Sequence, residues 1–274
     1  MERDADQPRR GMAVSSSTVG IVLLGGAVGV AIFGPLLAPF SPGLPSGAPL
    51  IAPSRGHLFG TNDIGQDLLS QWLWASRSSL LVGAGVTALS TALSWSFGIT
   101  AGLWPRAEGP LMAVTDLLLA LPSLLLYLLV VALLGPSRLH IVLTLGLFSW
   151  PAFARVVRAQ VIASRGAPHV AAAEALGATP LRIALRHVLP ATLGLLPAKL
   201  VLTVRFALFA DATLSFLGLG DRTNQSWGSM LGAAFNYPLL FLGPTWLWWT
   251  LPPALSIALV VLATTWLATG MEVG

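Results

Sequence analysis

Three ionisable residues stand within long apolar stretches of this 274-residue chain, and they are the first candidates for chemistry. Asp116, Arg205 and Asp211 carry charges that are expensive inside a membrane, where such residues mark a solute pathway or pair with one another in a helix bundle. Arg205 and Asp211 are six residues apart and therefore do not share a helix face. We hypothesise that all three belong to a translocation pathway, with structural pairing or snorkelling to the surface as the alternative. Lys199, a turn or two inside its apolar stretch, is expected to snorkel.

The other reactive residue types argue against catalysis on this chain. Its only lysine, Lys199, is not preceded by the glycine-rich GxxxxGK[ST] run that holds a nucleotide phosphate, so the chain has no ATP-binding motif of that kind. Cysteine is absent, and the four histidines are not clustered, so we expect no metal centre and no cofactor. If transport is driven, the energy comes from a partner.

The composition is that of an integral membrane protein. Hydrophobic residues make up 55% of the chain and charged residues only 9%, whereas about a quarter of the residues in a soluble domain are charged. The net charge of +4 does not indicate nucleic acid, because five arginines between Arg155 and Arg186 lie close to apolar stretches and fit the positive-inside bias.

We predict an all-α membrane protein of about six transmembrane helices. Residues 1–17 form a polar N-terminal tail, residues 18–270 form a single membrane domain, and the first apolar stretch is too long for a signal peptide. Gly98 and Gly102 are spaced for close contact with another helix. An even number of spans places both termini on one side of the membrane. The predicted spans are about 18–40, 79–104, 110–134, 140–161, 193–217 and 244–269, with loops at 41–78, 135–139 and 218–243 on the side opposite the termini.

A polar, arginine-bearing loop at 162–192 has the pattern of two short helices. Pro168 and Pro180 suit first helical positions, Gly177 stands where the first helix would stop, and Thr179 can cap the second. Pro190 is expected to end the second helix. We call residues 168–190 the knob. It either lies on the membrane surface as an amphipathic pair or is held by a soluble partner.

The knob resembles the cytoplasmic loop of the permease subunits of ATP-binding-cassette importers. The family pattern is Glu-Ala-Ala, three residues, Gly, and about nine residues later a hydrophobic residue ahead of Leu-Pro; in this chain Ala171 takes the place of the glutamate, and Glu174 follows three residues later. In that family the loop docks in a groove of the ATPase subunit and transmits its closure to the membrane helices. The resemblance implies a coupling role for His169, Ala171, Ala172, Ala173, Glu174, Gly177, Ala178, Thr179, Arg182, Leu189 and Pro190.

Further motifs follow in the family's order over about residues 57–250. An outer signature of peptide-type permeases is matched near residues 60–79, except that Asn62 and Gln66 together replace an acid and a base. Asp211 begins a DATLSFLGLG segment in which the family has glutamate, and a Ser-Trp-Gly-x-Met stretch follows at 226–230. The chain is similar to permeases of dipeptide, oligopeptide or nickel importers, of the branch with the shorter first outer loop.

The resemblance implies an ATP-driven peptide importer in which this chain forms half of the pathway. The implied partners are a second, homologous permease, two ATPase subunits that bind ATP and Mg, an extracytoplasmic substrate-binding protein and the lipid bilayer. The implied location is the bacterial inner membrane, with both termini cytoplasmic. A nickel or metal-chelate importer of the same family is an alternative, as are an ATPase-independent channel or ion-coupled carrier that uses Asp116 and Asp211, and a membrane scaffold without transport activity.

Overall fold

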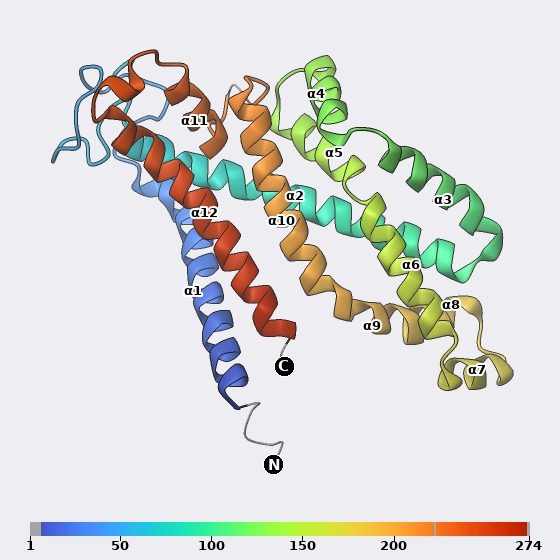
Figure 1. Ribbon diagram of the computed structural model, residues 1–274. Helices are drawn as coiled ribbons and strands as arrows, with labels where there is room; N and C mark the ends of the chain where they lie inside the picture. Colours follow the sequence, from blue (N-terminus) through green and yellow to red (C-terminus); the bar gives the residue numbers. More distant parts are fainter. Residues whose placement is uncertain (1–6, 222, 273–274) are drawn as a thin grey trace. The chain divides into compact units, whose positions relative to one another are not determined.

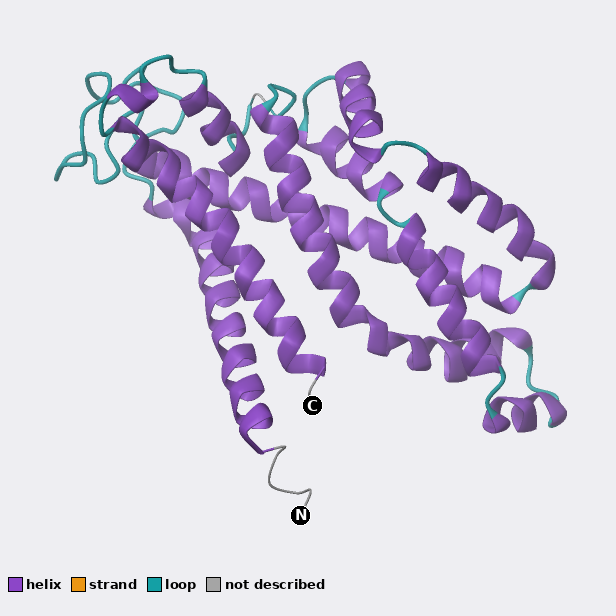
Figure 2. Ribbon diagram, in the orientation of Figure 1, coloured by secondary structure: helices purple, strands orange, loops and turns teal. Residues whose placement is uncertain are grey.

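The computed structural model describes residues 7–221 and 223–272, and within these residues the chain consists of helices joined by loops, with no strand (Figures 1 and 2). The prediction of an all-α membrane protein is confirmed. The long helices are α1 (Gln7–Leu37), α2 (Leu68–Leu103), α10 (Leu196–Phe216) and α12 (Thr245–Glu272). The shorter helices are α3 (Pro105–Ala120), α4 (Ser123–Leu134), α5 (Arg138–Phe148), α6 (Pro151–Arg165), α7 (Pro168–Ala175), α8 (Pro180–Ile183), α9 (Leu189–Thr192) and α11 (Trp227–Phe235).

Four of the described helical segments are long and apolar enough to cross a membrane by themselves, and two bent pairs bring the count to the predicted six if each pair crosses once. The stretch predicted as one span at 110–134 is such a pair, because α3 and α4 meet at 89°. Pro122 explains the break: a residue before proline avoids the helical conformation, and Leu121 is extended with φ −82° and ψ 140°. α5 and α6 form the second pair, bent by 42°.

Helix α2 begins at Leu68, eleven residues before the predicted start of the second span at 79, so that part of the predicted loop at 41–78 is helical. Asp67 accounts for the early start. One of its carboxylate oxygens accepts hydrogen bonds of 2.7 Å from both the main-chain N–H and the hydroxyl of Ser70, as an N-terminal cap does. The other lies 2.9 Å from Nδ1 of the buried His57, which ties the loop to the end of the helix.

The chain divides into two compact units, the first made of residues up to 84, 131–142 and from 204 onward, and the second of 85–130 and 143–203. In the first unit α1 lies along α12, and α11 packs against α12 (Figure 1). Leu68, Leu208, Trp227 and Trp249 are among the buried side chains at its centre. The single domain over residues 18–270 and the bounds of its loops remain predictions.

In the second unit α6 is the central helix, with α3 alongside it. Gly98 and Gly102 of α2 face Val157 and Val161 of α6 so closely that an added Cβ atom would lie 2.6 Å and 2.7 Å from the two valine Cβ atoms. The predicted close contact at these glycines is therefore confirmed. Trp95 Nε1 donates a hydrogen bond of 3.1 Å to the Thr192 hydroxyl, which links α2 to the segment that leads into α10.

The glycine contact gives a stability prediction. Replacing Gly98→Leu forces α2 and α6 apart, since even a Cβ atom would meet the Ala154 carbonyl oxygen at 2.8 Å, and overpacking of this kind costs about 1–3 kcal/mol. The thermal midpoint of the purified protein in detergent should fall. Gly25→Leu is the matched control, because it lies in α1 with open space around its Cβ position. Equal midpoints for the two variants would contradict the close contact.

Candidate functional site

The knob contains the two short helices that its sequence predicts, and their ends are set by local chemistry. Gly177 follows α7 with φ +81°, a left-handed conformation that glycine adopts without strain. The main-chain N–H of Ala178 then bonds back to the Ala173 carbonyl at 3.0 Å. Thr179 caps α8 by accepting the Arg182 main-chain N–H at 3.3 Å, with Pro180 at the first helical position. The knob is thus two short helices joined at a fixed turn.

The prediction that Pro190 ends the second helix is wrong. The helical path continues from Pro180 to Phe216 through a π-helical turn at Ala184–Val188, then α9, a 3₁₀ turn at Leu193–Leu195 and α10. In the π turn the Leu189 N–H bonds to the Ala184 carbonyl five residues back, which leaves room for the ring of Pro190 and removes the need for its missing N–H. The second helix of the knob therefore leads directly into the fifth span.

The inner side of the knob is fixed to the membrane helices by a buried apolar cluster. Val170 of α7 and Ile183 and Val188 of the second helix pack with Val157 and Val161 of α6, and all five side chains are at most 4% exposed. Trp95 and Leu103 of α2 complete the cluster. This packing fixes the knob to α6 and α2.

The outer side of the knob exposes three leucines together with Arg182 and Arg186. Leu176 is 89% exposed, and Leu181 and Leu185 are more than half exposed. The rings of His169 and His187 lie 5.7 Å apart between the two helices, so the structure brings these two histidines together. Of the other predicted coupling residues, Ala171, Ala172, Gly177, Thr179, Arg182 and Pro190 are exposed, Ala173, Ala178 and Leu189 are half-buried, and the Glu174 side chain lies outside what the structure describes.

The three predicted pathway residues are in different surroundings. Asp116 of α3 forms an ion pair with Arg155 of α6, and both side chains are about half exposed. A second ion pair joins Glu108 to Arg158 on the same two helices. Asp211 is buried in α10, whereas Arg205 is half-buried and has no ion pair in the described part of the chain. The structure does not pair Arg205 with Asp211.

Lys199 does not snorkel, contrary to the prediction. It is 3% exposed, its Nζ donates a hydrogen bond of 2.8 Å to the Ser90 hydroxyl of α2, and it lies 5.1 Å from the centre of the Phe153 ring. The hydrogen bond and the cation–π contact stabilise the lysine inside the protein. Ser90 is 109 residues away in the sequence, so no local pattern around Lys199 could have identified this partner.

A polar cluster that the sequence analysis missed lies in the first unit. Gln66 Oε1 accepts hydrogen bonds from Asn62 Nδ2 at 2.8 Å and Gln71 Nε2 at 2.6 Å. Asn62 and Gln66 are the two positions at which the sequence departs from the signature that it resembles, and the structure brings their side chains into contact.

Asp221 is an acidic residue that lines the same cavity as Asn62 and Gln66. Burial acts to raise the pKa of its carboxyl group, but hydrogen bonds from the side chains and main-chain N–H groups of Thr223 and Asn224 outweigh burial and hold that pKa below its usual value. The Arg138 main-chain N–H also donates to it, at 3.4 Å. Asp221 is therefore a stable negative charge.

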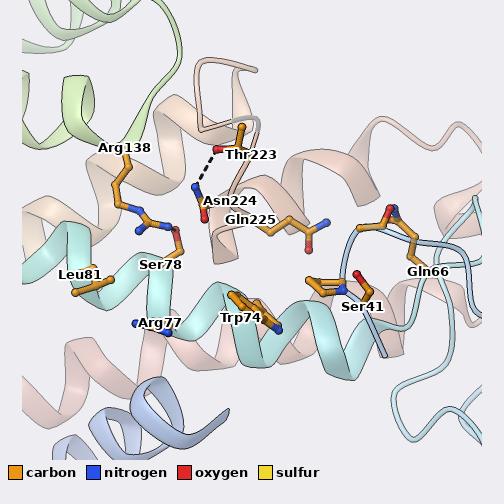
Figure 3. Close-up of a pocket in the computed structure, with 12 residues that line it drawn as sticks. Ser41, Gln66, Trp74, Arg77, Ser78, Leu81, Arg138, Thr223, Asn224 and Gln225 are labelled. Atoms are coloured by element: carbon orange, nitrogen blue, oxygen red, sulfur yellow. Dashed lines mark hydrogen bonds between the residues drawn. The ribbon is translucent and has the colours of Figure 1, made fainter. Parts of the chain in front are cut away.

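A cavity of about 770 Å³ opens beside this cluster (Figure 3). Figure 3 shows Arg138 reaching toward Ser78 on one side, Gln66 and Ser41 on the other, and Gln225 between them. Arg138 Nη2 donates a hydrogen bond of 3.1 Å to the Ser78 hydroxyl. The lining residues come from four separate parts of the sequence, which is why a reading of local motifs did not find the cavity.

The fold is that of a multi-pass membrane protein with a two-helix knob that exposes leucines and arginines. Comparison with known proteins shows its family: residues 94–272 match the family described as binding-protein-dependent transport system inner membrane component, and the chain belongs to it. The resemblance to permease subunits of ATP-binding-cassette importers is confirmed.

Several curated relatives cover most of the chain. It is 34% identical over 252 residues to the di/tripeptide transport system permease protein DppC of Pseudomonas aeruginosa, covering 88% of this chain and 81% of the relative. The dipeptide transport system permease protein DppC of Bacillus subtilis is 34% identical over 247 residues, covering 89% and 76%. The protein of the same name from Alkalihalophilus pseudofirmus is 33% identical over 258 residues, covering 93% and 83%.

The burial of Lys199 can be tested by chemical labelling, since it is the only lysine. An amine-reactive ester added to the native protein in detergent should leave Lys199 unmodified, because its Nζ is buried against Ser90. The same reagent should modify it after denaturation, which peptide mass spectrometry would detect. Rapid modification of Lys199 in the native protein would mean that this side chain reaches solvent.

Proposed function

We propose that this chain forms half of the translocation pathway of an ATP-driven importer of di- or oligopeptides. The relatives named above are di/tripeptide and dipeptide transport permeases, and they align with this chain over most of its length. The observation that carries the coupling part of the proposal is the knob, a rigid pair of helices whose outer side exposes three leucines.

In this proposal the knob is the docking element for a soluble ATPase subunit. Its exposed leucines would be costly to leave in water, at about 25 cal/mol for each Å² of apolar surface, and a groove in a partner would bury them. Arg182 and Arg186 flank this face and add donors for acidic or carbonyl groups of the partner. A partner that grips this face can move the knob as one body.

The proposed mechanism is alternating access. ATP and Mg bind to the two ATPase subunits, whose closure moves the knobs of this chain and of a second, homologous permease. The buried cluster at Val157, Val161 and Val170 passes the motion to α6, and the continuous helical path through the π turn passes it to α10. The two permeases then open the pathway toward an extracytoplasmic substrate-binding protein.

The proposed orientation follows from charge. The five arginines at and near the knob favour the cytoplasmic side, so the knob and both termini are cytoplasmic in this proposal. The loops that follow α1 and α10 then face outward, toward the binding protein. The chain would lie in the bacterial inner membrane.

The turn at Gly177 provides the test of coupling. Gly177→Val places a β-branched residue in a left-handed conformation, which costs about 1–2 kcal/mol and should distort the turn between the two helices. ATP-driven dipeptide uptake by the complete importer in proteoliposomes should then fall by roughly tenfold or more, the factor that about 1.4 kcal/mol represents.

The matched control is Gly177→Asn, because asparagine tolerates the left-handed conformation and the Cβ position is open. This variant should keep most of the uptake at equal amounts of complex in the membrane. Equal uptake by the valine variant, the asparagine variant and the wild type would contradict the coupling role of the knob.

A further inference from the structure

Two cavities in the first unit share lining residues and carry opposite charges. The cavity of about 770 Å³ is lined by Arg77 and Arg138, with no acid among its described lining residues (Figure 3). The second, of about 510 Å³, is lined by Asp63 and Asp221, with no base among its described lining residues. Gln66 and Gln225 line both cavities. The two cavities are therefore neighbours that share part of their walls, and we call them together the polar cleft: Arg77 and Arg138 line its cationic cavity, and Asp63 and Asp221 line its anionic cavity.

The cationic cavity has guanidinium groups available to a ligand. Arg138 Nη2 bonds only to the neutral hydroxyl of Ser78, and its buried Nε has no hydrogen-bond partner in the described part of the chain. The side chain of Arg77 is exposed. Neither arginine forms an ion pair with a described residue. A guanidinium in this state matches a carboxylate, to which it can donate two parallel hydrogen bonds.

The anionic cavity carries two carboxylates that form no ion pair with a described residue. The hydrogen bonds to Asp221 come from the neutral groups of Thr223 and Asn224 and from a main-chain N–H, so they keep its negative charge without cancelling it. Asp63 is exposed at the rim of the cleft. Two carboxylates in this setting attract a primary ammonium group.

The middle of the cleft offers groups that match a peptide bond. Gln66 and Gln225 each carry both a donor and an acceptor, and the buried Oε1 of Gln225 has no hydrogen-bond partner among the described residues. Trp74 adds an aromatic surface to the wall of the larger cavity. Both volumes fall in the range of about 300–1,000 Å³ that is usual for small-molecule sites. The cleft therefore suits a short ligand better than it suits the surface of a partner protein.

We infer that this cleft binds a short zwitterionic peptide, with its C-terminal carboxylate at Arg77 and Arg138 and its N-terminal ammonium at the Asp63 and Asp221 end. Gln66 and Gln225 bind the peptide bond between them, which makes recognition independent of the peptide's side chains. The inference rests on the proposed peptide transport and adds that this chain itself recognises both ends of the peptide.

The test is direct binding to the complex of permeases and ATPases without the substrate-binding protein, so that the selectivity of that protein does not contribute. The probes are radiolabelled alanyl-phenylalanine, its C-terminal amide and its N-acetyl form. Wild-type complex should bind the free dipeptide at least tenfold more tightly than either blocked form.

Two exposed residues allow variants that do not disturb the hydrogen-bonded core of the cleft. Arg77→Gln should lose the preference for the free carboxylate over the amide but keep the preference for the free ammonium. Asp63→Asn should show the converse loss. Arg55→Gln is the matched control, since Arg55 is an exposed arginine of the loop before α2 that lines neither cavity, and this variant should bind all three probes as the wild type does.

Three results would overturn the inference. The first is no binding of alanyl-phenylalanine by the wild-type complex. The second is that both variants keep the preferences of the wild type. The third is unchanged peptide affinity of the variants together with weakened docking of the binding protein, which would show that the cleft is a docking surface. Any of these results leaves the proposed function intact if the complete importer still takes up the dipeptide. Failure of the complete importer to take up any di- or oligopeptide would instead refute the proposed function.

Discussion

The packing of Val157, Val161, Val170, Ile183 and Val188 is the interaction on which the functional account depends. These side chains belong to α6, to α7 and to the second helix of the knob, and they are buried against one another. Without this cluster the knob would be joined to the membrane helices only through the chain that enters α7 and the helical path that leads into α10. With this cluster in place, a force on the exposed leucines would be transmitted to membrane helices that are closely packed and resist deformation.

Charge placement gives the second constraint. Inside an apolar environment an ionisable group needs a partner, and the described structure supplies several, including Ser90 for Lys199 and Arg155 for Asp116. The charges of the cleft in the first unit differ from the Asp116–Arg155 ion pair, because Arg138 and Asp221 are hydrogen-bonded to neutral groups. They also differ from the buried Lys199, because they line cavities. A charge held by neutral groups is not cancelled by a counter-charge, so it can still attract a charged group of a ligand. This is consistent with a site that binds and releases a polar solute.

Local chemistry was predictable from the sequence, and distant contacts were not. The turn at Gly177, the cap at Thr179 and the contact at Gly98 each follow from the type of one residue and its near neighbours. The passage of the helix through Pro190 depends on a π turn, and neither this turn nor the partner of Lys199 has a local sequence signal. The cleft is formed by segments from separate parts of the chain. The family motifs gave the order of these segments along the sequence but did not show that their residues form one site.

Site-specific cross-linking from the knob tests the central claim most directly, because the chain contains no cysteine and one introduced thiol is unique. A photoactivatable thiol reagent attached to Leu176→Cys in the assembled importer should cross-link to the ATPase subunit, with a yield that changes when ATP binds. Leu44→Cys, which is also exposed but lies in the loop after α1, should give no ATPase cross-link. Attachment of the position 176 probe to lipid alone, or reaction of that thiol with an impermeant reagent outside intact cells, would contradict the account.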